Sequence, residues 1–352
     1  MFPLTTDPRT ISERDFPAEG TAAEQWCFLL HYAVLAPSEY NSQPWYFKIR
    51  GPICEIYADY SRQLSVVDPD RRELLISCGA AFLNLRLALR YFGYGEELNL
   101  RTVEEQPALL ARIKIGAPVL ATAEEQRLFF AIQKRVTNRS MFEARPIAEE
   151  LLTRCEDVAG EEGVWLHRVT GQEHRTVAEM IAAGDRLLWE KKAFRHELAH
   201  WVHGQREIIE DGLPAFSSGK GNIAGIASPW LVRTVNLGRA EATRSEHLVA
   251  SAPLLIILGT YCDTPSDWFA TGQAMEKILL LATASGIQNS FVNQPIEVPA
   301  LRKQLHRMIG RYKIPQLVLR LGYGPGASVT PRRSISDVLL DVQQRPHDVY
   351  NL

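Results

Sequence analysis

The chain has 352 residues, of which 46% are hydrophobic and 23% charged, and its formal net charge is −2. A chain longer than about 250–300 residues favours two domains or one large fold built from two halves. The balanced charge gives no electrostatic reason to expect nucleic acid or a membrane surface as a partner, and the longest apolar runs have the length of strands. The five cysteines are scattered without a CxxC pair, and the N-terminus lacks a secretion signal, so we expect free thiols in the cytoplasm.

The first part of the chain predicts a helix, a hairpin and a second, buried helix. Thr21 opens a capping box and Pro37 breaks the helix that follows it. Alternating apolar residues over 45–59 predict two strands around a Gly-Pro turn. The stretch 72–95 is apolar on most sides and predicts a long buried helix, which a glycine ends. Two shorter strand-like segments follow, around 98–103 and 110–115.

A second block of elements begins near residue 126. Helical patterns dominate from 173 to 209, and the Gly-, Ser- and Pro-rich stretch 212–230 predicts an irregular loop. Buried strands are expected at 252–261 and 315–324, with a long apolar helix at 268–286 between them.

Two pairs of glycines in the long helices have the same spacing. Gly79 and Gly93 are fourteen residues apart, as are Gly272 and Gly286. Both helices are apolar nearly all round, as expected at the centre of a large fold. The repetition is consistent with two related halves, and also with two independent core helices.

The segment APSEYNSQPWYFKI, residues 36–49, concentrates short polar side chains between a helix and a strand. Ser38, Asn41 and Gln43 lie in this loop, next to free backbone N–H groups. Such a loop can donate hydrogen bonds to the carbonyls and ring nitrogens of a flat heterocycle. An ordinary polar turn has the same composition.

Two further segments are rich in groups that bind phosphate. Arg135, Thr137 and Arg139 have R-x-T-x-R spacing, and two guanidiniums with a hydroxyl at a turn suit a phosphate. Arg332 and Arg333 follow the last buried strand. Solvated arginines at turns would give the same pattern.

The stretch RHELAHWVHG contains H-E-x-x-H, in which His196 and His200 would lie on one helical face and could bind zinc, with Glu197 as general base. The extended form of this motif needs a glycine at position 203 and a third ligand at 206. The chain has His203 and Arg206 there. We therefore expect no metal site, and a zinc metalloprotease stays a distant alternative.

The segment 36–49 closely resembles the A-P-S-x-x-N-x-Q-P-W segment of the nitroreductase family of FMN enzymes. The stretch YADYSRQLSVVDPDRRELLISCGAA is similar to the Acg-like branch, whose members join two nitroreductase-like halves in one chain. The resemblance implies an α+β, nitroreductase-like fold with two pseudo-symmetric halves. It places the halves at 1–125 and 126–352, with a lid over the flavin at about 195–233.

The resemblance also implies where FMN binds, at one site per chain. It assigns the R-x-T-x-R segment and the late arginines to the phosphate, the 36–49 loop to the ring, and the segment QPIE, 294–297, to the ring face. The cofactor-binding residues implied are Pro37, Ser38, Asn41, Gln43, Arg135, Thr137, Arg139, Gln294, Pro295, Glu297, Arg332 and Arg333. No catalytic side chain is assigned, because the flavin carries out the redox step.

The function implied is FMN-dependent oxidoreduction, with NAD(P)H as electron donor and nitro compounds or quinones as acceptors at flavin N5. A protein that sequesters or stores FMN under a closed lid, with little turnover, is the alternative. Both predict a small-molecule partner, and a monomer is possible because both halves lie in one chain. Aerobic NAD(P)H oxidation by the flavin-loaded protein distinguishes them.

Overall fold

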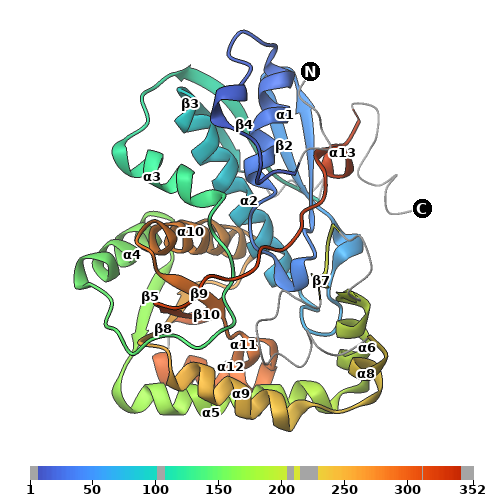
Figure 1. Cartoon of the computed structure of the whole chain (residues 1–352), viewed down its shortest axis with the longest axis vertical. Helices are drawn as coiled ribbons and strands as arrows, with labels where there is room; N and C mark the ends of the chain where they lie inside the picture. Colours follow the sequence, from blue (N-terminus) through green and yellow to red (C-terminus); the bar gives the residue numbers. More distant parts are fainter. Residues whose placement is uncertain (1–6, 101–107, 204–209, 215–228, 311, 342–352) are drawn as a thin grey trace.

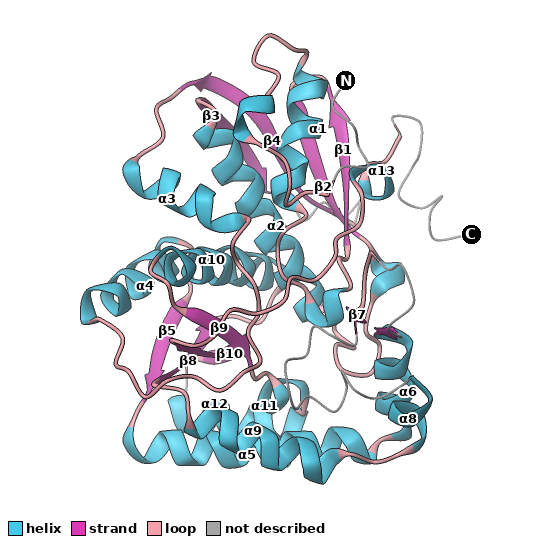
Figure 2. Ribbon diagram, viewed as in Figure 1, coloured by secondary structure: helices cyan, strands magenta, loops and turns pink. Residues whose placement is uncertain are grey.

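The structure is a computed structural model that describes residues 7–100, 108–203, 210–214, 229–310 and 312–341. Two four-stranded sheets form its framework, and helices pack against both (Figures 1 and 2). All strand pairs within these two sheets are antiparallel. The α+β class expected from the sequence is confirmed.

The first sheet has the strand order β1-β2-β4-β3. Its first two strands form the expected hairpin, in which Trp45 pairs with Ala58 and Gly51 adopts a φ of 56° at the turn. Trp45 and Phe47 are fully buried on the inner face. The strands are β1 (Trp45–Arg50), β2 (Ile53–Ala58), β3 (Tyr94–Leu100) and β4 (Leu109–Pro118).

Three helices accompany this sheet. The capping box predicted at Thr21 is present, because its hydroxyl accepts a hydrogen bond from the Glu24 N–H and the Glu24 carboxylate accepts one from the Thr21 N–H. The second helix is long and apolar enough to cross a membrane, but 83% of its most apolar window is buried inside the protein, as in a core helix. The helices are α1 (Ala22–Ala33), α2 (Arg72–Tyr91) and α3 (Ala123–Ile132).

The second sheet has the order β5-β8-β10-β9 and lies between two helical layers. In Figure 1, α4 and α10 cover one face, while α5, α9 and α12 lie across the other. Its strands are β5 (Trp165–Val169), β8 (Leu254–Thr260), β9 (Gln288–Phe291) and β10 (Ile314–Gly322). Its helices are α4 (Glu149–Glu161), α5 (Gly171–Glu190), α9 (Gly238–Ala250), α10 (Pro265–Ala284), α11 (Gln294–Glu297) and α12 (Pro299–Ile309).

The two sheets are joined by the packing of α2 against α10, which meet at two of the repeated glycines. A Cβ atom on Gly79 would lie 2.1 Å from the Phe269 carbonyl oxygen, and one on Gly272 would lie 1.9 Å from that of Ile76. Only glycine permits backbones to approach this closely. The predicted pseudo-symmetry and the boundary at residue 125 stay predictions.

The C-terminal part of the chain returns to the first sheet. After β10 it runs across the molecule to α13 (Ile335–Val338), which packs beside β1 (Figure 1). The Leu340 N–H donates to the Phe47 carbonyl at 2.8 Å. The chain after β10 therefore carries its arginines back toward the loop that precedes β1.

The predicted lid, 195–233, is described only in part, since residues 204–209 and 215–228 lie outside the described residues. Its described elements are α6 (Lys192–Trp201), β6 (Val202–His203), β7 (Leu213–Pro214) and α8 (Pro229–Thr234). Buried side chains of α6, such as Leu198, pack with Leu64 and Val67 of the first part. The described part of the chain also contains three short 3-10 helices: η1 (Glu13–Asp15), η2 (Glu39–Asn41) and η3 (Tyr60–Arg62).

Candidate functional site

A cavity of about 230 Å³ is lined by segments that are far apart in the sequence. Its lining includes residues of six segments: the loop before β1, the start of α2, residues 135–139, α9, the β9–α11 connection and the chain after β10. Nine of the twelve residues predicted to bind a cofactor line it: Pro37, Ser38, Asn41, Arg135, Thr137, Arg139, Gln294, Glu297 and Arg332. Most of the residues that the sequence predicted for one cofactor site therefore line the same cavity in the structure.

The loop before β1 has an unusual backbone. Tyr40, Asn41 and Gln43 all have positive φ, at 50°, 56° and 50°. Asparagine tolerates this conformation, but for tyrosine and glutamine it is strained, and such strain gathers at functional sites. The Ser38 hydroxyl stabilises the loop by accepting a hydrogen bond from the Gln43 N–H at 2.9 Å. Asn41 is held on both sides, donating to the Pro331 carbonyl at 3.1 Å and accepting from Arg332 at 2.9 Å.

Three of the predicted residues do not line the cavity. The Gln43 side chain accepts from the Arg333 N–H at 2.8 Å and donates to the Glu210 carbonyl at 2.7 Å. Arg333 donates to the Asp337 carbonyl at 2.6 Å, and Pro295 is buried at the start of α11. In this structure Gln43 and Arg333 fasten the C-terminal segment to the loop before β1.

A first arginine cluster consists of Arg9, Arg135 and Arg332. The Arg135 side chain is 2% exposed, and its Nε lies 3.5 Å from a carboxylate oxygen of Glu276. Its Nε and Nη1, and Nε of Arg332, have no hydrogen-bond partner among the described residues. Burial lowers the pKa of Arg332, and Arg9 and Arg135 lower it further. Buried guanidiniums with free N–H groups are suited to an anion.

A second arginine cluster consists of Arg139, Arg244 and Arg320. The Arg320 guanidinium is fully buried, lies 4.2 Å from the centre of the Phe142 ring and donates to the Asn138 carbonyl at 2.9 Å. Burial lowers its pKa to about 9, and the charges of Arg244 and Arg139 add to this effect. The R-x-T-x-R segment thus contributes one arginine to each cluster.

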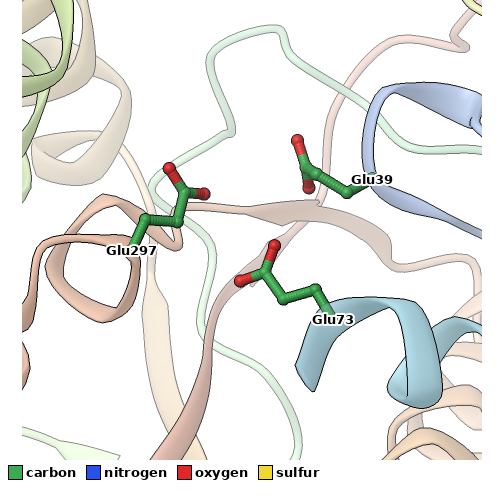
Figure 3. A group of neighbouring side chains, drawn as sticks. All are labelled: Glu39, Glu73 and Glu297. Carbon is green, nitrogen blue, oxygen red and sulfur yellow. The ribbon is translucent and has the colours of Figure 1, made fainter. Parts of the chain in front are cut away.

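Three carboxylates converge on the same cavity. Glu39, Glu73 and Glu297 come from different elements, and their carboxylates point toward one another (Figure 3). One carboxylate oxygen of each residue lies within 4.8 Å of those of the other two. Burial raises the pKa of Glu73 to about 8, although the neighbouring Arg72 opposes the shift. Burial also raises the pKa of Glu297 well above its ordinary value, and the charges of Glu73 and Glu39 add to it. Burial therefore favours the protonated forms of these carboxyl groups.

The H-E-x-x-H segment lies on α6, and its Glu197 is bound to the loop before α2. The Glu197 carboxylate accepts hydrogen bonds from the Val66 N–H at 2.8 Å, the Val67 N–H at 3.1 Å and the Ser65 hydroxyl at 3.2 Å. Within the described ranges, the only grouping of three His, Cys, Asp or Glu ligands with metal-like spacing is that of the three glutamates. Glu197 fastens α6 to the loop before α2, and nothing in this geometry favours zinc chemistry there.

Several cavity residues were missed by sequence reasoning: Arg9, Glu39, Glu73, Arg244 and Arg320. Arg320 had a usable signal, since it is the only charge in the largely apolar strand PQLVLRLG. Glu39 lies inside the segment that was singled out. Arg9 and Arg244 lie in segments of ordinary charged composition, so only the fold identifies them.

No known family model matches the chain. A putative NAD(P)H nitroreductase of Mycobacterium tuberculosis is 27% identical over 317 residues, which cover 88% of this chain and 90% of that protein. The protein of the same organism named as the putative NAD(P)H nitroreductase Acg is 24% identical over 315 residues, covering 87% and 92%. Among solved structures, the FMN and NADPH-dependent nitroreductase NfnB of a Sphigopyxis strain is 20% identical with a TM-score of 0.42, covering 62% of this chain and 99% of that one.

The relatives match over almost their whole length, so the similarity is not confined to one motif. It includes both the region of the first sheet and that of the second. The resemblance predicted from residues 36–49 and from the following helix is confirmed as a similarity, over most of the chain, to proteins named as putative NAD(P)H nitroreductases, Acg among them.

Proposed function

We propose that the protein is an FMN-dependent oxidoreductase that transfers electrons from NAD(P)H to nitro compounds or quinones. One observation carries this proposal: the unpartnered guanidinium nitrogens of Arg135 and Arg332 line the same cavity as the strained loop at Tyr40 and Asn41. An anion site and a polar, preorganised loop around one space are what a phosphorylated flat ring requires. The names of the relatives support the same reading.

The residues of the cavity fit the two ends of FMN. The phosphate would be held by Arg9, Arg135 and Arg332, together with the Thr137 hydroxyl. A planar guanidinium can donate two parallel hydrogen bonds to the oxygens of one phosphate. Asn41 would face the ring from the loop before β1, and the QPIE segment at the start of α11 would lie against it. When bound, the flavin supplies the acceptance and donation of hydride.

The protein's own groups would supply charge and protons. The first arginine cluster neutralises a dianion that the low-dielectric cavity would otherwise exclude. Burial raises the pKa of Glu73 to about 8, and its Oε2 has no hydrogen-bond partner in the described part of the chain, so the protonated group would be available to release a proton toward the cavity. Apolar side chains such as Trp189 and Leu248 line the cavity and exclude water.

A second function has support from one observation. The Glu197 carboxylate makes three hydrogen bonds to residues 65–67, and these hold α6 against the first part of the protein. A covering held in this way favours sequestration or storage of FMN with little turnover. In both versions of the proposal the protein lies in the cytoplasm and binds one flavin per chain, and a monomer is possible because both halves lie in one chain.

A visible spectrum of the purified protein tests the cofactor, and the flavin released on denaturation gives its amount. About one FMN per chain is expected; two per chain, or FAD, would contradict the single site. Aerobic consumption of NADH and NADPH then separates the two functions. Steady consumption supports the oxidoreductase, and a bound flavin that neither nucleotide reduces supports storage.

A further inference from the structure

We infer that the second arginine cluster is a binding site for the carboxylate of the electron acceptor, so that the protein prefers aromatic acceptors that carry one. The inference rests on the proposed function for the identity of the reaction. It goes beyond that function because it names the chemistry of the substrate and the residues that select it.

The first step is the state of Arg320. Its side chain is fully buried on β10, and its Nε and Nη1 lack hydrogen-bond partners among the described residues. Its guanidinium makes one hydrogen bond, to the Asn138 carbonyl, and stacks on Phe142. A buried cation with two open N–H groups is unstable unless an anion completes its surroundings. Because Arg320 lines the cavity, the anion can enter from there.

The second step is the balance of charge in the cluster. Arg244 lies 3.6 Å from a carboxylate oxygen of Glu241 and donates to the Arg139 carbonyl at 3.0 Å. Arg139 has Glu39 as its nearest opposing charge, but burial raises the pKa of Glu39 and so favours its neutral form. Arg320 has no acidic partner in the described ranges. The cluster therefore carries an excess of positive charge.

The third step separates this cluster from the phosphate site. The cations that act on Arg332 are Arg9 and Arg135, with Glu276 and Asp7 as opposing charges, whereas the cations that act on Arg320 are Arg244 and Arg139. In the proposed function, the phosphate of FMN binds the first cluster. The second is left for an anionic group on another molecule.

The fourth step concerns the apolar walls beside the cluster, which indicate the rest of the ligand. Arg244 and Leu248 lie one turn apart on α9, and both line the cavity. Phe291 and Leu317 line it from β9 and β10. The guanidiniums thus adjoin apolar walls that suit an aromatic ring. The convergent glutamates in Figure 3 also line the cavity, and burial favours their protonated forms, which repel a carboxylate less than three anions would.

The test compares two acceptors of nearly the same shape, 4-nitrobenzoate and its neutral amide, with the flavin-loaded protein. The KM of the wild type is expected to be about tenfold lower for the benzoate, the effect of one charged hydrogen bond. Arg320→Met should remove that preference by raising the KM for the benzoate about tenfold, with little change for the amide. Arg320→Lys should restore part of it. Equal KM values in the wild type would overturn the inference.

Arg186→Met is the matched control, because the Arg186 side chain is 49% exposed on α5 and pairs with Glu246 outside the cavity. It should leave both KM values unchanged.

If Arg320→Met fails to fold, Arg244→Met gives the same readout from the more exposed member of the cluster. Loss of flavin in the Arg320 and Arg244 variants would show that the cluster holds the cofactor phosphate. A rise in KM for NADPH alone would show that it binds the donor's phosphate. Either result rejects the acceptor site.

Failure of the proposed function has a different signature. A protein without flavin reduces neither acceptor, yet the cluster can still be tested by calorimetric titration of 4-nitrobenzoate and the amide into the wild type and Arg320→Met. Binding of the benzoate that the substitution weakens about tenfold supports the carboxylate site without any turnover. Equal affinity for the benzoate in both proteins overturns it.

Discussion

Burial affects the two kinds of charged group in the cavity in opposite ways. The glutamates can escape the penalty by taking up a proton, and burial raises the pKa of Glu73 to about 8. The arginines cannot escape in this way, since even the lowered pKa of Arg320, about 9, leaves it charged at neutral pH. Protonation therefore lowers the cost of burying the three glutamates, whereas an anionic ligand would be needed to lower that cost further for the arginines. In this cavity, the arginines are therefore the groups that an anionic ligand would stabilise most.

The largest expected effect is on the arginine side. Arg135→Ala should weaken FMN binding about ten- to a hundredfold, because the loss of a charged hydrogen bond is worth about 1.5–3 kcal/mol. Asn41→Ala should cost only about 1 kcal/mol, since it makes a neutral contact. Titration of FMN into the two apoproteins measures both.

The variant Arg139→Ala sharpens this prediction. The R-x-T-x-R spacing assigned Arg139 to the phosphate, while the structure groups it with Arg244 and Arg320. An affinity loss as large as that of Arg135→Ala would place both clusters on one phosphate. Wild-type affinity in Arg135→Ala would refute the phosphate assignment itself.

The next effect is on the carboxylate side and concerns stability. Because the pKa of Glu73 is higher in the folded protein than its ordinary value of 4.5, the folded state binds more protons between these two values. The free energy of unfolding should therefore fall as pH rises through this interval, and it should level off above about pH 8. Glu73→Gln should make the apoprotein about 1–3 kcal/mol more stable than wild type at about pH 9, with a smaller difference at about pH 6.

Denaturant unfolding at the two pH values measures this difference. Glu179→Gln is the control, since Glu179 is 67% exposed on α5 in a surface pair with Arg175. It should follow the wild type at both pH values. If Glu73→Gln also follows the wild type, Glu73 is ionised in the folded protein and the comparison fails.

A smaller effect is expected on turnover. If Glu73 releases the proton that an acceptor needs, the rate of nitro reduction should fall several-fold as pH rises above about 8, where its carboxyl group loses that proton. Glu73→Gln should be slower at all pH values and should lose this decline. A pH–rate profile of both proteins checks the prediction, and identical slopes would assign the proton to another group.

The smallest effect is expected outside the cavity. His196→Ala and His200→Ala should leave flavin content unchanged, and no zinc should copurify in stoichiometric amount. Glu197 of the same motif is engaged with the backbone of Val66 and Val67. Metal analysis of the purified protein is the measurement. One tightly held zinc ion per chain would reverse this view of α6.

Much of the secondary structure could be predicted from local signals. The capping box at Thr21 starts α1, alternation in 45–59 gives the β1–β2 hairpin, and an unbroken apolar helix pattern gives α2. The segment 36–49 could also be identified, because its order of residues is characteristic. These features depend on neighbours along the chain, and the sequence displays such neighbours directly.

The composition of the cavity depended on tertiary structure. Glu39, Glu73 and Glu297 are far apart in the sequence, and no local pattern indicates that their carboxylates converge. The separation of Arg135 from Arg139 into two clusters likewise follows from how residues 135–139 pass between β9 and the chain after β10. Burial and neighbouring charge set the protonation of such groups, and both are properties of the folded chain. The residue types were therefore determined by the sequence, and their chemistry was decided by the fold that brings them together.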